Sequence, residues 1–338
     1  MTAGVKRFRD GGQIAILGAG SMGRLWAALL PSSRCGFLPR LDRLGQTAEP
    51  SNIAPEDGAG HRGRFSRPEG APETRCEYVI VSSVSPDIGV ARTLVNRPWL
   101  CSAADTSLLL VTTKAGDTLS ALESWLPYIA KDTPVVLFQN GLGSQQAVAE
   151  RWPEQPILAA STTEGANRPE PDVLVHAGTG DTWVGPLTDS ASGYTESVVQ
   201  QLAQSGLQVH IENSIVQRLW QKLVVNAGIN AFTALLDCPN GAIVDAPLYR
   251  QTIDGLCTEI AALLHADTGE RTAPQALRER IEAVAKSTAN NTSSMRADVN
   301  AGRKTEIDFI KGYLVQCGQR HGIATPVNQM LVQRVKAF

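Results

Sequence analysis

Residues 14–30 read IAILGAGSMGRLWAALL, and this stretch predicts the fold of the first half of the chain. The apolar run at 14–17 predicts a short buried strand, and the mostly apolar segment after Gly23 predicts a helix. The turn between them has the pattern G-x-G-x-x-G. Its first glycine permits a tight turn, its second lets backbone approach a pyrophosphate, and its third lets helix pack on strand. The helix N-terminus adds unpaired N–H groups for phosphate oxygens. We therefore expect a dinucleotide site at Gly18, Ala19, Gly20, Ser21, Met22 and Gly23.

Short apolar runs continue after this turn. They predict strands at 35–38, 78–81, 108–112 and 135–138, with a helix over 116–128. Alternation of strands and helices is typical of a doubly wound parallel sheet. Later runs, separated by Gly, Pro and Asn, predict edge-type strands at 157–160, 173–176 and 182–184.

The stretch at 45–75 interrupts this alternation. It is rich in proline, glycine and charges of both signs, which predicts a long surface loop rather than a binding arm.

The residues after the second strand bear on which dinucleotide binds. An arginine there would pair with the 2′-phosphate of NADP, whereas an acidic residue would accept a hydrogen bond from the ribose of NAD. Arg40 and Arg43 favour NADP, and Asp42 between them leaves NAD open. An ordinary exposed loop with three charges is the third interpretation.

The second half of the chain has a different pattern. Strand signals fade after about residue 213, and apolar periodicity predicts helices over 214–236, 247–265, 274–290 and 304–321. We expect a dinucleotide-binding domain over 1–212 and an all-helical domain over 213–338.

A polar stripe interrupts the first of these helices. Lys222, Asn226 and Asn230 are spaced i, i+4, i+8, so they drift by only about 80° around the helix and share a face. The rest of the segment is apolar nearly all round, as in a buried helix. Because an unpartnered buried amide or ammonium is costly, the stripe must face something polar. A substrate pocket and plain helix–helix hydrogen bonds, with Lys222 reaching solvent, both satisfy that requirement.

A second polar cluster comprises Asn291, Ser294, Asp298 and Glu306. Some of these residues could cap helices instead, and Thr305 also fits a helix start. A carboxylate such as Glu306 near Lys222 would keep that lysine charged and oriented, as a general acid requires.

Composition excludes several classes of protein. The 338 residues carry a net charge of −2, which gives no electrostatic footprint for nucleic acid or an anionic membrane. No apolar run is long enough for a membrane helix, and residues 1–12 lack the apolar stretch of a signal peptide. Six scattered cysteines, with no C-x-x-C pair, argue against a disulfide scaffold and against a structural zinc site, and favour a cytoplasmic location. The five histidines show no metal spacing, so we expect no metal site.

Several ordered blocks together resemble the ketopantoate reductase (2-dehydropantoate 2-reductase) family over nearly the whole chain. The blocks are ILGAGSMGRLWAALL at 16–30, VTTKAG at 111–116, LFQNGLG at 137–143, STTEGA at 161–166, HAGTGDTWVGP at 176–186, RLWQKLVVNAGINAFTALLDCPNG at 218–241, NTSSMRADVNAGRKTEIDFIKG at 291–312 and HGIATPVNQML at 321–331.

This resemblance implies a Rossmann-type NADP-binding domain followed by a helical domain of the 6-phosphogluconate-dehydrogenase type. It implies reduction of 2-dehydropantoate to (R)-pantoate with NADPH, in pantothenate and coenzyme A biosynthesis. Lys222 would protonate the carbonyl oxygen, and Glu306 would bind substrate and cofactor and fix the lysine. The implied substrate-binding residues are Asn140, Asn226, Asn230, Asn291 and Ser294. Asn140, Lys114 and Arg40 would contact the cofactor, with Arg40 at the 2′-phosphate.

Two other functions stay open at this point. A reductase of another 2-oxo acid would use the same scaffold, since pocket shape selects the substrate's side chain. A non-catalytic NADP-binding sensor is the alternative from a different class, although it would have no need of a proton donor. In each case we expect a small-molecule ligand and a monomer or homodimer, without nucleic acid or membrane.

Overall fold

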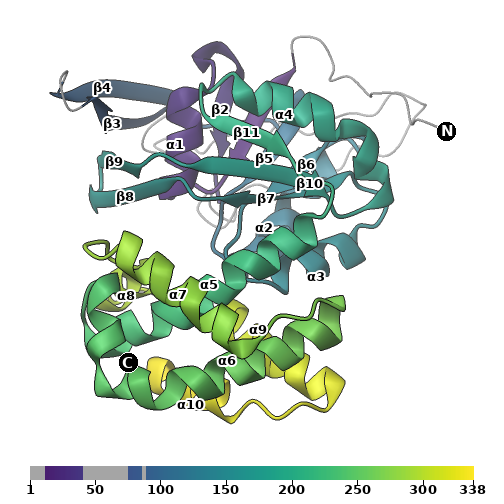
Figure 1. Cartoon of the computed structure of the whole chain (residues 1–338). Coiled ribbons are helices and arrows are strands. Elements are labelled where there is room, and N and C mark those ends of the chain that lie inside the picture. Colours follow the sequence, from purple (N-terminus) through teal and green to yellow (C-terminus); the bar gives the residue numbers. More distant parts are fainter. Residues whose placement is uncertain (1–11, 41–74, 86–88) are drawn as a thin grey trace. The chain divides into compact units, whose positions relative to one another are not determined.

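The computed structural model describes residues 12–40, 75–85 and 89–338, and the chain divides into two compact units (Figure 1). Unit 1 comprises residues 1–139 and 145–215, and unit 2 comprises 140–144 and 216–338. The loop predicted at 45–75 lies outside the described residues, except that Arg75 begins a strand.

Unit 1 is built on a seven-stranded sheet of order β11-β10-β7-β6-β5-β1-β2. The strands are β1 (Gln13–Leu17), β2 (Cys35–Leu38), β5 (Thr106–Val111), β6 (Val135–Leu137), β7 (Ile157–Thr162), β10 (Asp181–Pro186) and β11 (Gln208–Ile211). The five strands from β2 to β7 in this order pair in parallel, and β10 pairs antiparallel with β7. The predicted parallel sheet is confirmed, with a reversal of direction at β10.

Helices cover both faces of this sheet because alternate strand residues point to opposite sides. Ile14 and Ile16 of β1 pack with α1 (Ser21–Leu29), whereas Ala15 and Leu17 pack with α2 (Ala115–Trp125). Two further helices, α4 (Thr195–Ala203) and α3 (Ser144–Arg151), extend the α1 side and the α2 side, respectively. The doubly wound arrangement is therefore confirmed.

A second, four-stranded sheet, which the sequence patterns did not predict, lies on the α1 side. Its order is β4 (Gly89–Pro98), β3 (Arg75–Ser85), β9 (Val173–Gly178) and β8 (Gly165–Glu170). Assigning 78–81 to the parallel sheet was wrong, because β3 pairs antiparallel with β4 and parallel with β9. Buried Tyr78 alternates with exposed Glu77, the pattern of a strand with one face covered.

The three strands predicted as edge-type are all interior. β7 lies between β6 and β10, β9 between β3 and β8, and β10 between β7 and β11. Every residue of β7 is buried. The prediction of edge strands rested on Gly, Pro and Asn residues that lie mainly in the connecting segments. Residues in these segments do not indicate which strands pair with one another.

Unit 2 is all-helical, as predicted (green to yellow in Figure 1). Its helices are α5 (Ile215–Leu236), α6 (Pro247–Thr268), α7 (Pro274–Ser287), α8 (Ser294–Asn300), α9 (Ile307–His321) and α10 (Pro326–Lys336). The short helices α8 and α10 were not predicted, and α7 ends before residue 290. Within the described ranges, no helix is both long and apolar enough to cross a membrane.

Candidate functional site

Two glycines of the turn after β1 are required by the fold of unit 1 itself. Gly18 has φ +114°, and a Cβ there would lie 2.7 Å from the backbone nitrogen of Thr113. Thr112 Oγ1 donates a 2.7 Å hydrogen bond to the Gly18 carbonyl and so fixes the turn. A Cβ on Gly23 would collide with that same carbonyl. These positions thus have the local roles that the motif predicts.

Gly20 is different, because neither its backbone conformation nor any neighbour among the described residues requires glycine there. Its φ is −75°, and a Cβ would meet no atom within 4 Å. Gly20 is the N-cap of α1 and supplies no side-chain cap to the first-turn N–H groups. The open space before these donors fits the approach of an anionic diphosphate. The residues present therefore fit a dinucleotide.

Two predicted cofactor residues follow the two strands that flank β1 in the parallel sheet. Arg40 comes after β2 and Lys114 after β5, and β1 with its glycine turn lies between these strands. The exposed Arg40 guanidinium forms a 3.3 Å ion pair with Asp117 in the first turn of α2. Lys114 is half-buried at the N-cap of α2. Asp42 and Arg43, which also bear on the cofactor, lie outside the described residues.

Two arginines beside the glycine turn were missed by sequence reasoning. The Ala19 carbonyl accepts hydrogen bonds from Arg24 Nε at 3.2 Å and from Arg168 Nη1 at 3.4 Å. The guanidinium of Arg24 also lies 4.9 Å from the centroid of the Tyr78 ring. An arginine directly after Gly23 in an otherwise apolar helix was the available signal. Both cations make the surroundings of the turn favourable for an anion.

In unit 2, Lys222 and Glu306 come together as the hypothesis of a paired lysine requires. Lys222 lies on α5, and Glu306 is the N-cap residue of α9. Burial lowers the pKa of Lys222 to about 8, and the nearby Glu306 carboxylate opposes that shift. Removal from water disfavours the ammonium, whereas an opposite charge favours it. The result is a lysine that is charged at neutral pH and still able to release its proton.

Asn140 joins this pair from a distant part of the sequence. Its Nδ2 donates to Glu306 Oε2 at 3.4 Å. Gly141, with φ +81°, packs so tightly on the Phe309 carbonyl that a Cβ would collide with it. The same carbonyl accepts a 2.9 Å hydrogen bond from the Leu142 N–H. The start of α9 thus fixes the Q-N-G turn and brings Asn140 to the carboxylate.

The remaining predicted substrate residues lie on three segments of unit 2. Asn226 is half-buried and Asn230 is buried on α5, in helical register with Lys222. Asn291 is exposed between α7 and α8, and its carbonyl accepts a hydrogen bond from the Asn240 N–H. Ser294 is exposed at the first residue of α8.

Other members of the second polar cluster have structural partners. Ser293, not Ser294, caps α8, since its Oγ accepts from the Arg296 N–H. The Asp298 carboxylate forms a 3.0 Å ion pair with Arg303. The cap of α8 is therefore made by the residue next to the predicted cluster, and Glu306 makes no side-chain cap at the start of α9.

Family profiles match both halves of the chain. The profile described as "Ketopantoate reductase PanE/ApbA" matches residues 14–189, and "Ketopantoate reductase PanE/ApbA C terminal" matches residues 214–338.

Similar curated proteins are named 2-dehydropantoate 2-reductase. The protein from Vibrio cholerae is 39% identical over 233 residues, covering 68% of this chain and 77% of its own length. The protein from Halobacterium salinarum is 32% identical over 324 residues, covering 96% of this chain and 98% of its own.

Solved structures share the fold over the same extent. The 2-dehydropantoate 2-reductase from Geobacter metallireducens matches with a TM-score of 0.72 at 24% identity, covering 96% of this chain and 99% of that one. D-mandelate dehydrogenase in complex with NADH matches with a TM-score of 0.74 at 20% identity, covering 96% and 98%. At these identities the likeness concerns the fold alone. From the profiles and the sequence identities, this chain belongs to the ketopantoate reductase family.

Proposed function

We propose that this chain reduces the C2 ketone of 2-dehydropantoate to (R)-pantoate with NADPH, as a cytoplasmic enzyme of pantothenate biosynthesis. A relative named for this reaction, 32% identical, supports the proposal over 96% of the chain. The observation that carries it is the Lys222–Glu306 pair, beside which Asn140 donates to the carboxylate.

The two domains divide the task. Residues 1–212 hold the cofactor and residues 213–338 supply the proton donor and substrate contacts. Only small molecules are bound, and the chain acts as a monomer or homodimer.

Lys222 is the general acid in this proposal. Its ammonium donates a proton to the carbonyl oxygen as negative charge develops there, and its positive charge stabilises that oxygen. A pKa of about 8 suits the role, because the group is protonated at neutral pH and more acidic than an ordinary lysine. Glu306 keeps the ammonium charged and oriented.

The amide stripe of α5 supplies the polar contacts that a hydroxy acid needs. Asn226 and Asn230 share the face of Lys222, and Asn291 and Ser294 complete the substrate-binding set. Asn140, held by Glu306, contacts both substrate and cofactor, as does Glu306 itself.

The cofactor is held by residues of unit 1. The turn from Gly18 to Gly23 receives the diphosphate, Arg40 pairs with the 2′-phosphate, and Lys114 contributes a further positive charge. When bound, the reduced nicotinamide supplies the hydride that the ketone carbon accepts.

Loss of the near-ultraviolet absorbance of NADPH in the presence of 2-dehydropantoate tests this function. We expect fast oxidation with 2-dehydropantoate and slow oxidation with a panel of other 2-oxo acids. Preference for another acid would overturn the substrate, and cofactor binding without turnover on any acid would indicate a sensor.

Arg40→Gln tests the cofactor assignment in the same assay. The KM for NADPH should rise, while the KM for NADH, which lacks the 2′-phosphate, should change little. An equal effect on both cofactors would contradict the role of Arg40.

A further inference from the structure

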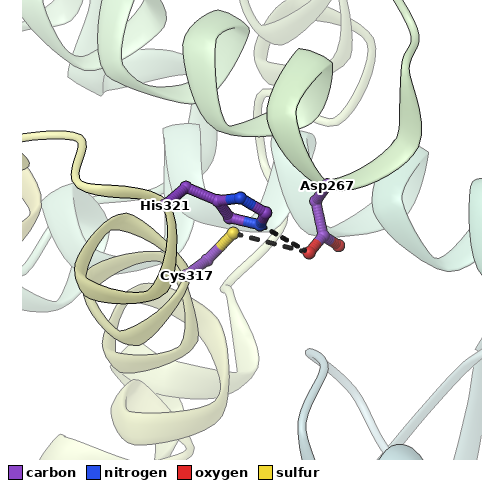
Figure 2. A group of neighbouring side chains, drawn as sticks. All are labelled: Asp267, Cys317 and His321. Carbon is purple, nitrogen blue, oxygen red and sulfur yellow. Dashed lines mark hydrogen bonds and ion pairs between the residues drawn. The ribbon is translucent and has the colours of Figure 1, made fainter.

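Three side chains that the proposed reaction does not use converge in unit 2. Cys317 and His321 lie one turn apart on α9, and Asp267 lies near the end of α6 (Figure 2). One carboxylate oxygen, Asp267 Oδ1, is 3.7 Å from Cys317 Sγ and 3.4 Å from His321 Nε2. All three potential ligand atoms lie within 4.8 Å of one another.

The two separations measured from Asp267 Oδ1 are close to the edges of a tetrahedron around zinc. Zinc bonds of about 2.3 Å to sulfur and about 2.0–2.1 Å to nitrogen and oxygen place tetrahedral ligands about 3.5 Å (S–O) and about 3.3 Å (N–O) apart. The observed 3.7 Å (S–O) and 3.4 Å (N–O) distances exceed these values by about 0.1–0.2 Å, and the third separation lies within 4.8 Å. We propose that Asp267, Cys317 and His321 bind a divalent transition-metal ion of the zinc type, with water as the fourth ligand.

The donor set selects the class of metal. A thiolate and an imidazole suit zinc and its neighbours in the first transition row, whereas calcium and magnesium require oxygen ligands. The helical spacing also suits a metal, because residues i and i+4 project from one face and converge on a common point. The spacing of the histidines in the sequence does not reveal this site. Its ligands are a cysteine and a histidine in a C-x-x-x-H pattern and an aspartate about 50 residues earlier in the chain.

The surroundings of Asp267 orient its carboxylate for this role. The second oxygen, Oδ2, accepts hydrogen bonds from Trp220 Nε1 at 3.0 Å and from the Tyr313 hydroxyl at 3.3 Å. These two donors hold Oδ2 and turn Oδ1 toward the thiol and the imidazole. Outer-shell hydrogen bonds of this kind fix the orientation of ligands in metal sites.

Binding requires two local changes that the site permits. The Cys317 thiol, which donates to Asp267 Oδ1, must lose its proton to solvent as the metal–sulfur bond forms. Arg320 Nη2, which lies 3.6 Å from Oδ1, must move away and give up its contacts with Tyr313, namely a 3.5 Å hydrogen bond to the hydroxyl and the stacking of the guanidinium on the ring; the side chain is 57% exposed. Cys317 is buried, but His321 is partly exposed, so an ion enters from the histidine side.

Cobalt(II) titration of the full-length, reduced and cofactor-free protein tests the proposal. Cobalt reports its ligands, because a thiolate ligand gives a charge-transfer band in the near ultraviolet and tetrahedral geometry gives intense visible bands. We expect one cobalt per chain, both signatures, and displacement by zinc. Absence of the thiolate band would overturn the proposal and leave a hydrogen-bonded cluster only.

Variants assign the binding to these residues. His321→Gln and Cys317→Ser should each weaken zinc binding by at least the roughly 10–100-fold that loss of an outer-shell contact costs. Cys101→Ser is the matched control, since Cys101 is an exposed thiol of unit 1 and should leave binding unchanged. Cys317 is buried, so Cys317→Ser could prevent folding. His321 is exposed, so His321→Gln should fold and still test the proposal. Unchanged affinity in His321→Gln would overturn the proposal.

Discussion

Two lysines of unit 2 are alike in chemistry and differ in surroundings. Burial lowers the pKa of Lys222 to about 8 and that of Lys311 to about 7, and a glutamate opposes the shift in each case. Lys222 is half-buried, whereas the Lys311 side chain is fully buried and donates to Asn328 Oδ1 at 3.2 Å. Both lysines meet the usual description of a perturbed functional group.

The partner of Lys311 is occupied entirely by protein. Glu259 accepts hydrogen bonds from the N–H groups of Val327 and Asn328, at 2.7 and 3.0 Å, and from Asn328 Nδ2 at 2.7 Å. Its carboxylate therefore caps the N-terminus of α10 from α6, a favourable place for negative charge. This pair joins three helices.

The partner of Lys222 lies among groups that can also serve a ligand. Asn140 donates a 3.4 Å hydrogen bond to Glu306, and the amides of Asn226 and Asn230 continue the polar face of α5. A lowered lysine pKa thus does not by itself identify a catalytic residue. The groups around each lysine distinguish the two roles. Lys311 stabilises the packing of the helices, and we assign proton donation to Lys222.

Replacing each lysine should separate the two roles most strongly. Lys222→Ala should lower kcat for 2-dehydropantoate reduction by roughly 10²–10⁴-fold, the usual contribution of a general acid, while NADPH binding persists. Lys311→Met, measured below its unfolding temperature, should keep kcat within a few-fold of wild type. Comparable losses of turnover in both variants would contradict the assignment of a catalytic role to Lys222 and a structural role to Lys311.

Turnover should depend most on the Lys222 pair, whereas stability should depend most on the Lys311 pair. Replacing the glutamate of each pair tests the effect on stability. Glu259→Ala leaves a buried lysine unpaired and α10 uncapped, so unfolding in urea should become easier by about 3–5 kcal/mol. Glu306→Ala should cost less, because Glu306 is only half-buried. Equal losses of unfolding free energy would show that the second pair is also structural.

The pH dependence of stability should identify Lys311. Its pKa of about 7 in the folded chain is below the usual 10.5, so the unfolded chain binds more protons between these values. Stability contributed by this group therefore rises with pH from about 7 to 10.5, by at most about 1.4 kcal/mol per pH unit. Wild type should gain stability relative to Lys311→Met as pH rises from 7 to 10. The exposed Lys286→Met is the control and should show no such divergence.

The smallest effect concerns how Glu306 tunes Lys222. Its carboxylate raises the lysine pKa against the effect of burial, so Glu306→Gln should move the alkaline limb of the activity profile to lower pH. The measurement is kcat/KM against pH for the residual activity of the variant. A limb that stays in place would mean that Glu306 acts through substrate contacts alone.

Features with local causes were predicted well from the sequence. The glycine turn was recognised from its own spacing, although Gly18 and Gly23 also pack against Thr112 and Thr113, which lie far away in the sequence. The stripe of Lys222, Asn226 and Asn230 follows from helical periodicity. The sequence left open whether that stripe faced a ligand or other helices.

Features that depend on tertiary contacts were predicted poorly. The residues alone did not show that Glu306 and Asn140 reach one point, and a lysine in an amphipathic helix gives no sign of the full burial seen at Lys311. β3 was assigned to the wrong sheet because apolar runs show that a strand exists but do not identify its partners. Cys317 and Asp267 likewise meet only in the folded helical unit.

The dependence of kcat/KM on pH for NADPH-driven reduction of 2-dehydropantoate tests the central claim most directly. If Lys222 is the acid, its proton must be present in the free enzyme, so kcat/KM should be high near pH 7 and fall as pH rises through about 8. A profile that stays level up to pH 10 would contradict the assignment of Lys222 as the proton donor.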